Sequence, residues 1–190
     1  MLLVMLLSFA FHWLVDWVAC RFPVKTLSRH FRNLKQNDSI SGTDFAWRTS
    51  VISEIHALVT GLGSPLVFFL TPGLSTDLIG KSSSLAVNLV SYSTGYFLMD
   101  TIHMYLFSKT KGTVELMVHH AVIILCFSSS LFSGKYVGYA VVALLVEVNS
   151  IFLHLRRLSK YLCIPRAIAF SRVLCFANIG ESTSLECFCA

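Results

Sequence analysis

Long apolar runs constrain the fold of this chain more than any other feature of its sequence. Each is about as long as the α-helix needed to cross roughly 30 Å of hydrocarbon. An open sheet would leave backbone groups unpaired in lipid, and membrane barrels show alternating strands instead of continuous runs. The sequence therefore predicts an all-α, multi-pass transmembrane helix bundle with about five complete spans. The runs cover residues 2–20, 49–70, 85–107, 116–133 and 136–155, and a partial sixth covers 166–177.

Composition supports a bundle that faces lipid instead of water. Of the 190 residues, 55% are hydrophobic and only 13% are charged, which fits a soluble domain poorly. The first run could be a signal peptide. It lacks a basic segment at its start and carries His12 and Asp16 deep in its length, so we favour an uncleaved anchor.

The chain divides into four parts on this reading. Residues 1–20 form the anchor, 21–46 a basic cytosolic loop, 47–170 the transmembrane core, and 171–190 a divergent tail. The six cysteines show no paired metal spacing and lie largely in or beside the spans, which argues against a disulfide framework.

The basic residues lie mostly in the segments that follow the first, third and fifth spans. By the positive-inside rule these segments are cytosolic, and the N-terminus lies outside. The sequon at Asn37 should then carry no sugar, because glycosylation requires a luminal position. The opposite side receives only Lys81 and Lys135. The cytosolic side receives Arg21, Lys25, Arg29, Arg32, Lys35, Arg48, Lys109, Lys111, Arg156, Arg157, Lys160, Arg166 and Arg172.

Two turns help to place the helices relative to one another. Pro72 and Gly73 end the second span, and residues 133–135 leave room only for a tight hairpin between the fourth and fifth spans. We therefore expect the spans at 116–133 and 136–155 to pack as antiparallel neighbours.

Ionisable and strongly polar residues inside the spans are the candidates for a functional site. Such groups are expensive in lipid and usually face the bundle interior. We estimate the depth of each residue by counting from the cytosolic end of its span and multiplying by the helical rise. Polar residues from four spans then lie in one layer, about 9–14 Å from the cytosolic boundary. The residues of this layer are Glu54, His56, Asp100, His119 and Glu147, and the same spans also carry His103, His120, Asn149 and His154.

Helical spacing indicates which of these side chains can share a face. Asp100 and His103 are three residues apart, which permits carboxylate–imidazole pairs with neighbouring helices. His119 and His120 are about 100° apart around their helix, so they cannot both point the same way, and we expect one to enter the layer while the other meets a neighbouring helix.

Three interpretations of this layer remain open. The first is catalysis on an acyl group, for which the candidates are His119, His120, Glu147 and Asp100. The second is a zinc or iron site, which the absence of a spaced ligand motif disfavours, so we predict no metal. The third is structural, with interhelical hydrogen bonds worth about 0.6 kcal/mol each. As a lipid pocket, the layer would comprise His56, Asp100, His103, His119, His120, Glu147 and Asn149.

Other function classes are less consistent with the sequence. The net charge of +5 could suggest nucleic acid as a partner, but the basic residues flank the spans and follow the topology, so we predict none. Nothing resembles a selectivity filter or a pair of inverted broken helices, as in channels and transporters.

The order of these residues resembles the TLC domain family over most of the chain. Trp47 and Arg48 precede the pattern Ser53-x-x-His56-x-x-x-x-Gly61, Gly95-Tyr96-Phe97 precedes Asp100, and the pair His119-His120 follows. The most specific segment runs from Phe132 through Glu147 and Asn149 to Arg156. It is similar to the branch that contains TLC domain-containing proteins 1 and 2.

The resemblance implies a multi-pass membrane protein that regulates phospholipid acyl composition, and hence fluidity, by limiting the incorporation of polyunsaturated fatty acids. It implies the plasma membrane, although topology alone fits the endoplasmic reticulum equally well. The expected partners are membrane lipids and other membrane helices. No cofactor is expected.

Two departures leave alternatives open. The ceramide synthases of this family acylate sphingoid bases with a histidine pair followed by a His-Asp element, where this chain has Val146-Glu147. An acyltransferase that uses acyl-CoA as donor is therefore the second hypothesis. The family continues with further spans beyond about Phe170, whereas this chain becomes poor in apolar residues there. The third hypothesis is accordingly a truncated structural partner of a full-length relative.

Overall fold

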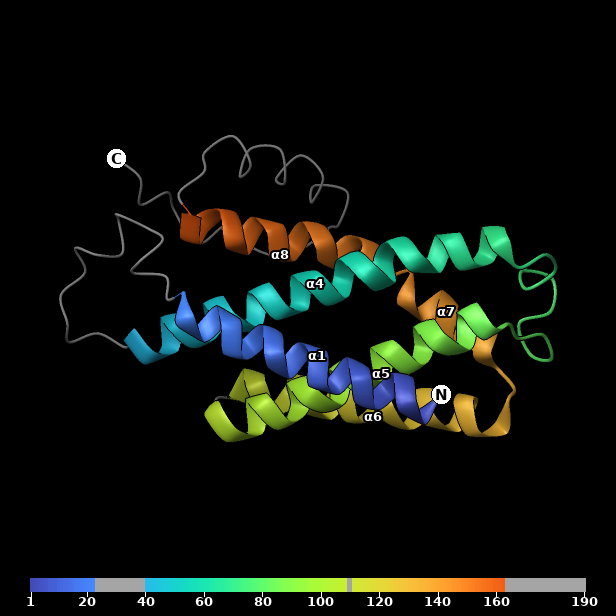
Figure 1. Ribbon diagram of the computed structural model, residues 1–190, viewed down its shortest axis with the longest axis horizontal. Helices are drawn as coiled ribbons and strands as arrows, with labels where there is room; N and C mark the ends of the chain where they lie inside the picture. Colours follow the sequence, from blue (N-terminus) through green and yellow to red (C-terminus); the bar gives the residue numbers. More distant parts are fainter. Residues whose placement is uncertain (23–39, 109–110, 163–190) are drawn as a thin grey trace.

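The computed structural model describes residues 1–22, 40–108 and 111–162, and gives no side chains for 40–43 and 160–162. Its helices traverse the molecule in alternating directions, and no strand occurs within these ranges (Figure 1). The predicted all-α bundle is confirmed. The helices are α1 (Leu2–Arg21), α4 (Ile40–Leu70), α5 (Ser84–Phe107), α6 (Lys111–Ser133), α7 (Val137–Leu144) and α8 (Glu147–Leu162).

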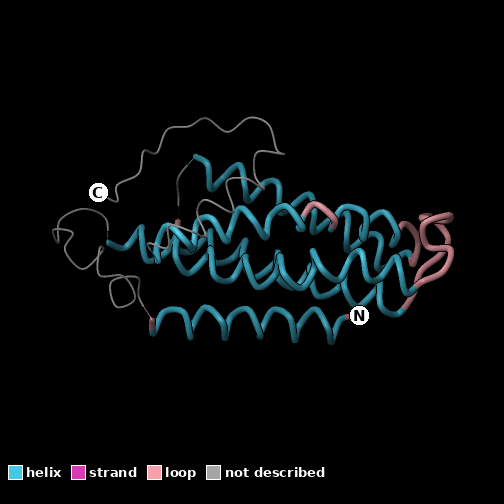
Figure 2. The backbone as a smooth tube through the Cα atoms, turned by 90° about the horizontal axis from the view of Figure 1, so that it is seen from above, coloured by secondary structure: helices cyan, strands magenta, loops and turns pink. Residues whose placement is uncertain are grey.

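Helix α5 is the central element of the bundle. It contacts α1, α4, α6 and α7, whereas α8 packs chiefly along α4. Figure 2 shows α1 on one side of the bundle, separated from most of the other helices. The ends of α1, α5 and α8 and the starts of α4 and α6 meet at one end of the molecule (Figure 1), which we call the basic end. The loop at 71–83 lies at the other.

Polar and apolar side chains are distributed as lipid requires. The outer surface carries Phe69, which is 85% exposed, together with Leu3 and Leu125, whereas His56 and Thr94 are buried. Among the described residues, four helical segments are long and apolar enough to cross a membrane, so the chain is a multi-pass membrane protein. They are Leu2–Arg21, Asp44–Leu70, Lys111–Ser133 and Val137–Ser159.

The predicted span at 85–107 corresponds to α5, which has 24 residues but is not among these four segments. Its buried face is unusually polar, with Ser91, Ser93 and Thr94 all fully enclosed. Helix α5 nevertheless crosses the bundle from end to end (Figure 1). Its polar face is covered by protein, so its composition reflects the neighbouring helices more than the lipid.

Glycines allow three close approaches between elements. A Cβ at Gly95 would overlap the backbone carbonyl of Met5 in α1 and come within 2.9 Å of the Ser8 side chain. A Cβ at Gly61 would lie 3.0 Å from the backbone at Glu147, and one at Gly138 would lie 2.7 Å from Leu78 Cα. Small residues at such contacts let membrane helices approach closely.

The predicted span at 136–155 is interrupted. Tyr136 precedes α7 in a left-handed conformation, with φ 64°, and α7 ends at Leu144. Around residues 145–146 the backbone bonds join residues three apart, as in the bond from Leu145 N–H to Val142 O. This is the tighter 3₁₀ pattern, which often marks a change of helix direction. The break lies where Gly61 of α4 approaches the chain.

This break changes how the last two predicted spans pack. The expectation that they are antiparallel neighbours is right for α7, which contacts α6. It is wrong for α8, whose principal neighbour is α4, on the opposite side of the bundle from α6 (Figure 1). The apolar run and the short hairpin gave no sign of the change in direction.

Several predictions fall on residues outside the described ranges. They concern most of the loop at 21–46, the sequon at Asn37, the partial span at 166–177 and the tail at 171–190. Helix α4 itself begins at Ile40, before the expected start of the transmembrane core at residue 47.

Candidate functional site

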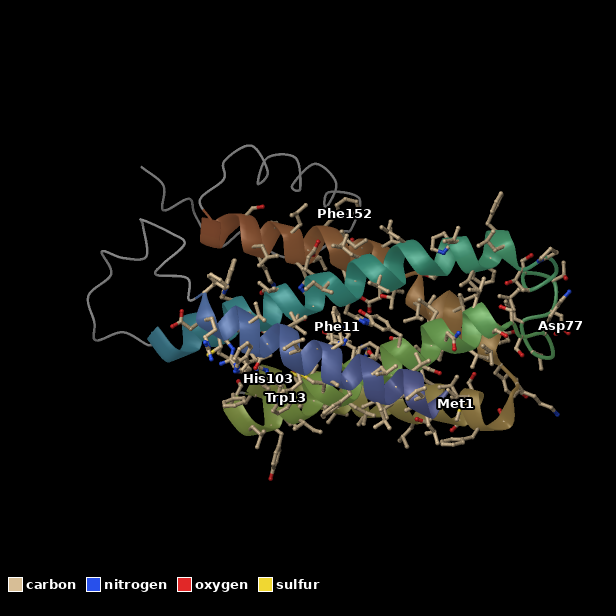
Figure 3. All side chains as sticks on the ribbon, viewed as in Figure 1. Met1, Phe11, Trp13, Asp77, His103 and Phe152 are labelled. Carbon is tan, nitrogen blue, oxygen red and sulfur yellow. The ribbon has the colours of Figure 1, made fainter. Side chains whose placement is uncertain are left out.

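A charged cluster ties three helices together near the basic end. Arg48 of α4 donates from Nε to Asp16 Oδ1 of α1 at 2.9 Å, and its Nη2 also bonds Asp16 Oδ2. His103 of α5 places Nε2 within 3.2 Å of both Arg48 Nη2 and Asp16 Oδ1. In Figure 3, the side chains around His103 include a concentration of nitrogen atoms between α1 and α5. The opposite charges of Arg48 and Asp16 thus compensate each other inside the bundle.

A second carboxylate–imidazole contact joins α5 to α6. Asp100 Oδ2 lies 3.4 Å from His120 Nδ1, and the two side chains are only 6% and 7% exposed. The sequence predicted such pairs between helices, and both Asp100–His120 and Asp16–His103 are of this kind. Asp100 and His103 nevertheless separate, because one faces α6 and the other faces α1 and α4.

A stack of aromatic and imidazole rings forms a third interior cluster, between α4 and α5. His56 of α4 stacks on Tyr96 of α5 with ring centroids 3.8 Å apart and an interplanar angle of 11°. The Tyr96 hydroxyl donates to Ser53 Oγ at 2.9 Å, which holds the ring against α4. Phe97 lies 5.3 Å from the His56 ring and 4.9 Å from the His120 ring. The stack therefore connects His56 with the Asp100–His120 pair.

His12 adds α1 to this stack. Its Nδ1 lies 2.8 Å from the Ser8 carbonyl oxygen, and its Nε2 lies 3.2 Å from the Tyr92 hydroxyl. The Ser8 hydroxyl donates to the Tyr92 carbonyl at 2.6 Å. These bonds fix the ring of a fully buried histidine 6.2 Å from that of His56.

In the part of the chain that the structure describes, four histidines have a buried Nδ1 without a hydrogen-bond partner, namely His56, His103, His120 and His154. His56 and His103 are the most deeply enclosed, each only 1% exposed.

The structure brings together only part of the predicted site. His56, Asp100, His103 and His120 lie in the interior, whereas His119 is exposed and the α8 residues Glu147 and Asn149 are half-buried. The Glu147 carboxylate bonds the Ser150 side chain and is close enough to His119 for an electrostatic interaction. As expected from the helical angle, only one histidine of the adjacent pair enters the interior.

Several interior residues lie outside the site predicted from the sequence. Two of them are His12 and Asp16 of the first span, to which the rule for ionisable residues in lipid applies equally. The stripe at 92, 96, 100 and 103 on α5 has helical spacing and gave a second signal. Asp100 and His103 on that stripe indicate that it faces a polar interior. There Tyr92 contacts His12, and Tyr96 stacks on His56.

The chemical capacity of the site follows from its enclosure. Asp100 can orient the His120 ring, which would then accept or donate a proton at Nε2. The His120 ring packs against Phe97, and its side chain is only 7% exposed, so a reacting group has little access to it. Among the described residues, no group of three or more His, Cys, Asp or Glu side chains is placed to hold a metal ion.

Comparison with known proteins bears on the whole bundle. The family model described as the TLC domain matches residues 46–179. TLC domain-containing protein 2 of Danio rerio is 42% identical over 137 residues, covering 71% of this chain and 55% of that protein. The human protein of the same name is 37% identical over 141 residues, covering 74% of this chain and 53% of its own length.

A second group of relatives is somewhat more distant. TLC domain-containing protein 1 of Mus musculus is 34% identical over 114 residues, covering 60% of this chain and 46% of that protein. The chain thus spans about half the length of the curated relatives that it matches. No solved structure matches it significantly.

Proposed function

Because this chain belongs to the TLC domain family, we propose that it regulates the acyl composition of membrane phospholipids, limiting the incorporation of polyunsaturated fatty acids. Its partners on this proposal are membrane lipids, and its effect is on membrane fluidity. The proposal adopts the role that the resemblance to the branch of TLC domain-containing proteins 1 and 2 implies.

The enclosure of the Asp100–His120 pair is the observation that favours a role without histidine catalysis. Both side chains are at least 93% covered, and Phe97 packs on the imidazole ring. A catalytic histidine must come within hydrogen-bond reach of its substrate, directly or through one water molecule. On this proposal the polar interior does not react with lipid. It fixes the shape of the helix bundle, and the outer surface of that bundle contacts lipid.

The direct test uses this chain in cells that lack its relatives. After loading with a polyunsaturated fatty acid, phospholipid acyl chains are measured by mass spectrometry. Expression should lower the polyunsaturated share, and His120→Ala should retain this effect wherever the protein remains folded. Ser129→Ala, at an exposed position of the same helix, is the matched control. An unchanged lipid profile with the protein confirmed in the membrane would contradict the proposal.

An acyl-CoA-dependent acyltransferase is the second candidate. The Asp100–His120 contact favours it, because a carboxylate that orients an imidazole is a recurrent arrangement for a general base. In that case His120→Ala and Asp100→Asn would both abolish the lipid change while the variants stayed in the membrane. The leading proposal would then be replaced by catalysis.

A structural partner of a longer TLC protein is the third candidate. It is favoured by the coverage of about half of each relative and by the exposure of His119 near Glu147 on the lipid-facing side. Such a partner would co-purify with a full-length relative and would have no effect when expressed alone. Co-expression of differently tagged forms measures this directly.

Localisation and orientation belong to the proposal as well. We place the protein in the plasma membrane, with the endoplasmic reticulum as the alternative, the N-terminus outside and residues 21–46 in the cytosol. The grouping of Arg21, Arg48, Lys111 and Arg156 at one end of the bundle (Figure 1) supports this orientation.

A further inference from the structure

Two adjoining cavities lie between α1 and α4 at the basic end, and their linings differ in chemistry. The first, of about 270 Å³, is lined by Asp44, Phe45, Arg48 and Phe107 among others. The second, of about 650 Å³, is a groove lined only by apolar side chains, from Leu14 and Val18 on α1 to Val51 and Ile55 on α4. Ala19 and Trp47 line both cavities, so the polar pocket and the apolar groove adjoin at these two residues.

The packing of α1 explains why this groove exists. Gly95 and Ser8 bring α1 close to α5, and α1 has a smaller interface with α4 than with α5. Helix α1 lies on one side of the bundle (Figure 2), and the groove lies along its flank toward α4. The opening lies on the outer surface, where Leu14 is 56% exposed and Val18 is 43% exposed. Lipid therefore has direct access to the groove.

The polar pocket presents both signs of charge beside aromatic rings. Arg48 is held in place by two bonds to Asp16, and Asp44 supplies a carboxylate in the same pocket. The rings of Phe45, Trp47 and Phe107 complete the lining. Guanidinium groups bind phosphate, and a carboxylate beside aromatic faces suits a quaternary or primary ammonium. Because Asp16 already pairs with Arg48 and Asp44 adds a second carboxylate, the pocket has no net positive charge, which disfavours an anionic headgroup relative to a zwitterionic one.

We propose that these cavities form a binding site for one zwitterionic phospholipid. Its phosphate lies at Arg48, its ammonium lies between Asp44 and the aromatic rings, and one acyl chain fills the groove between α1 and α4. This inference rests on the proposed function, because it names the class of lipid on which that function would depend. Arg48 lies at the start of an apolar span, the depth at which headgroups meet hydrocarbon.

Native mass spectrometry of the purified full chain tests the site with phosphatidylcholine and phosphatidylglycerol as probes. The wild-type protein should retain phosphatidylcholine at least about fivefold more than phosphatidylglycerol. Val51→Trp fills the groove and should reduce retention about fivefold or more. Asp44→Asn should remove the preference for phosphatidylcholine while lipid binding itself continues. Leu62→Trp is the control, because Leu62 lies on the same helix, is 65% exposed and does not line the groove.

Each outcome has a defined meaning. Equal retention of the two lipids, or unchanged retention by Val51→Trp, would overturn the proposal and indicate lipid bound only to the general apolar surface. Leu14→Trp, on the opposite wall and already exposed, repeats the test if Val51→Trp does not fold. The cellular lipid assay separates the two proposals. If binding is lost and the lipid effect persists, the site is not needed for the function, whereas binding without any lipid effect would contradict the function alone.

Discussion

Arg48 is the residue whose charge matters most to the interior. It is the basic partner of Asp16 and also contacts His103, so its removal leaves a carboxylate uncompensated among three helices. Removing one partner of a fully buried ion pair costs about 3–5 kcal/mol. The Arg48 side chain is 19% exposed.

We therefore expect Arg48→Ala to destabilise the protein by about 2–3 kcal/mol, somewhat below the range for complete burial. Adding Asp16→Asn should recover part of this loss, because the unpaired charge is gone. Unfolding in mixed detergent micelles measures both. Arg21→Ala is the control, since Arg21 is exposed and lies over the Trp17 ring. Additive losses in the double variant would refute the ionic coupling.

The adjacent histidines His119 and His120 should respond differently to substitution. His120→Ala removes the partner of buried Asp100, and we expect a loss of about 1–2 kcal/mol, near the upper values for interhelical polar contacts. His119→Ala, at an exposed position, should cost less than about 0.5 kcal/mol. Thermal unfolding of the two variants in the same detergent decides the matter. Equal losses would mean that His119 also has an interior role.

At the scale of single residues, helical spacing predicts which side chains share a face of a helix, but it does not predict the groups that surround them. The angle between the paired histidines correctly implied that only one enters the interior. The same reasoning could not assign Asp100 and His103 to different neighbours, because helical spacing defines a face but not the helix that covers it. Tyr92 and Tyr96 were missed because an aromatic residue in a span is normally unremarkable. Only the bundle reveals that they contact His12 and His56.

The α1–α5 interface depends on the absence of a side chain at Gly95. A Cβ there would overlap the Met5 carbonyl of α1, so the helices must separate to accommodate it. Gly95→Ala should destabilise the protein by about 1–3 kcal/mol, as overpacking generally does. Gly112→Ala is the control, because nothing lies within 4 Å of that position. A disulfide cross-link between engineered cysteines in α1 and α5 would report the separation, and unchanged cross-linking would contradict the expectation.

The apolar runs predicted where helices occur but not where one of them breaks. Residues 144–146 are Leu-Leu-Val, with no glycine or proline to signal an interruption. The 3₁₀ turn there coincides with the close approach of α4 at Gly61, which is a tertiary effect. Pro65, conversely, lies inside α4 without ending it. Neighbouring helices and hydroxyl groups can satisfy the freed backbone groups in membrane helices.

For the whole molecule, the distribution of basic residues predicts one orientation in the membrane. The end that carries Arg21, Lys111 and Arg156 should face the cytosol, and the loop at 71–83 should face outside. Native Asn37 should then remain without sugar, whereas Gly73→Asn creates a sequon with Ser75 that should become glycosylated. Asparagine tolerates the positive φ of 80° at this position.

Endoglycosidase digestion followed by gel mobility reports both sites. The matched control is Gly73→Asn combined with Ser75→Ala, which lacks the sequon and should migrate without a shift. Sugar on the native Asn37 would reverse the proposed orientation. It would also place the candidate phospholipid site in the opposite leaflet.

The ion pair between Asp16 and Arg48 also affects how the helices assemble during synthesis of the chain. The two residues are 32 positions apart, and the bond from Ser8 to Tyr92 spans 84. At a synthesis rate of about 5–20 residues per second, Arg48 is made roughly two to six seconds after Asp16, and α5 is made later still. During that interval α1 is an unassembled helix with a bare carboxylate. We therefore expect α1 to need protection from lipid at Asp16 until α4 has been inserted beside it.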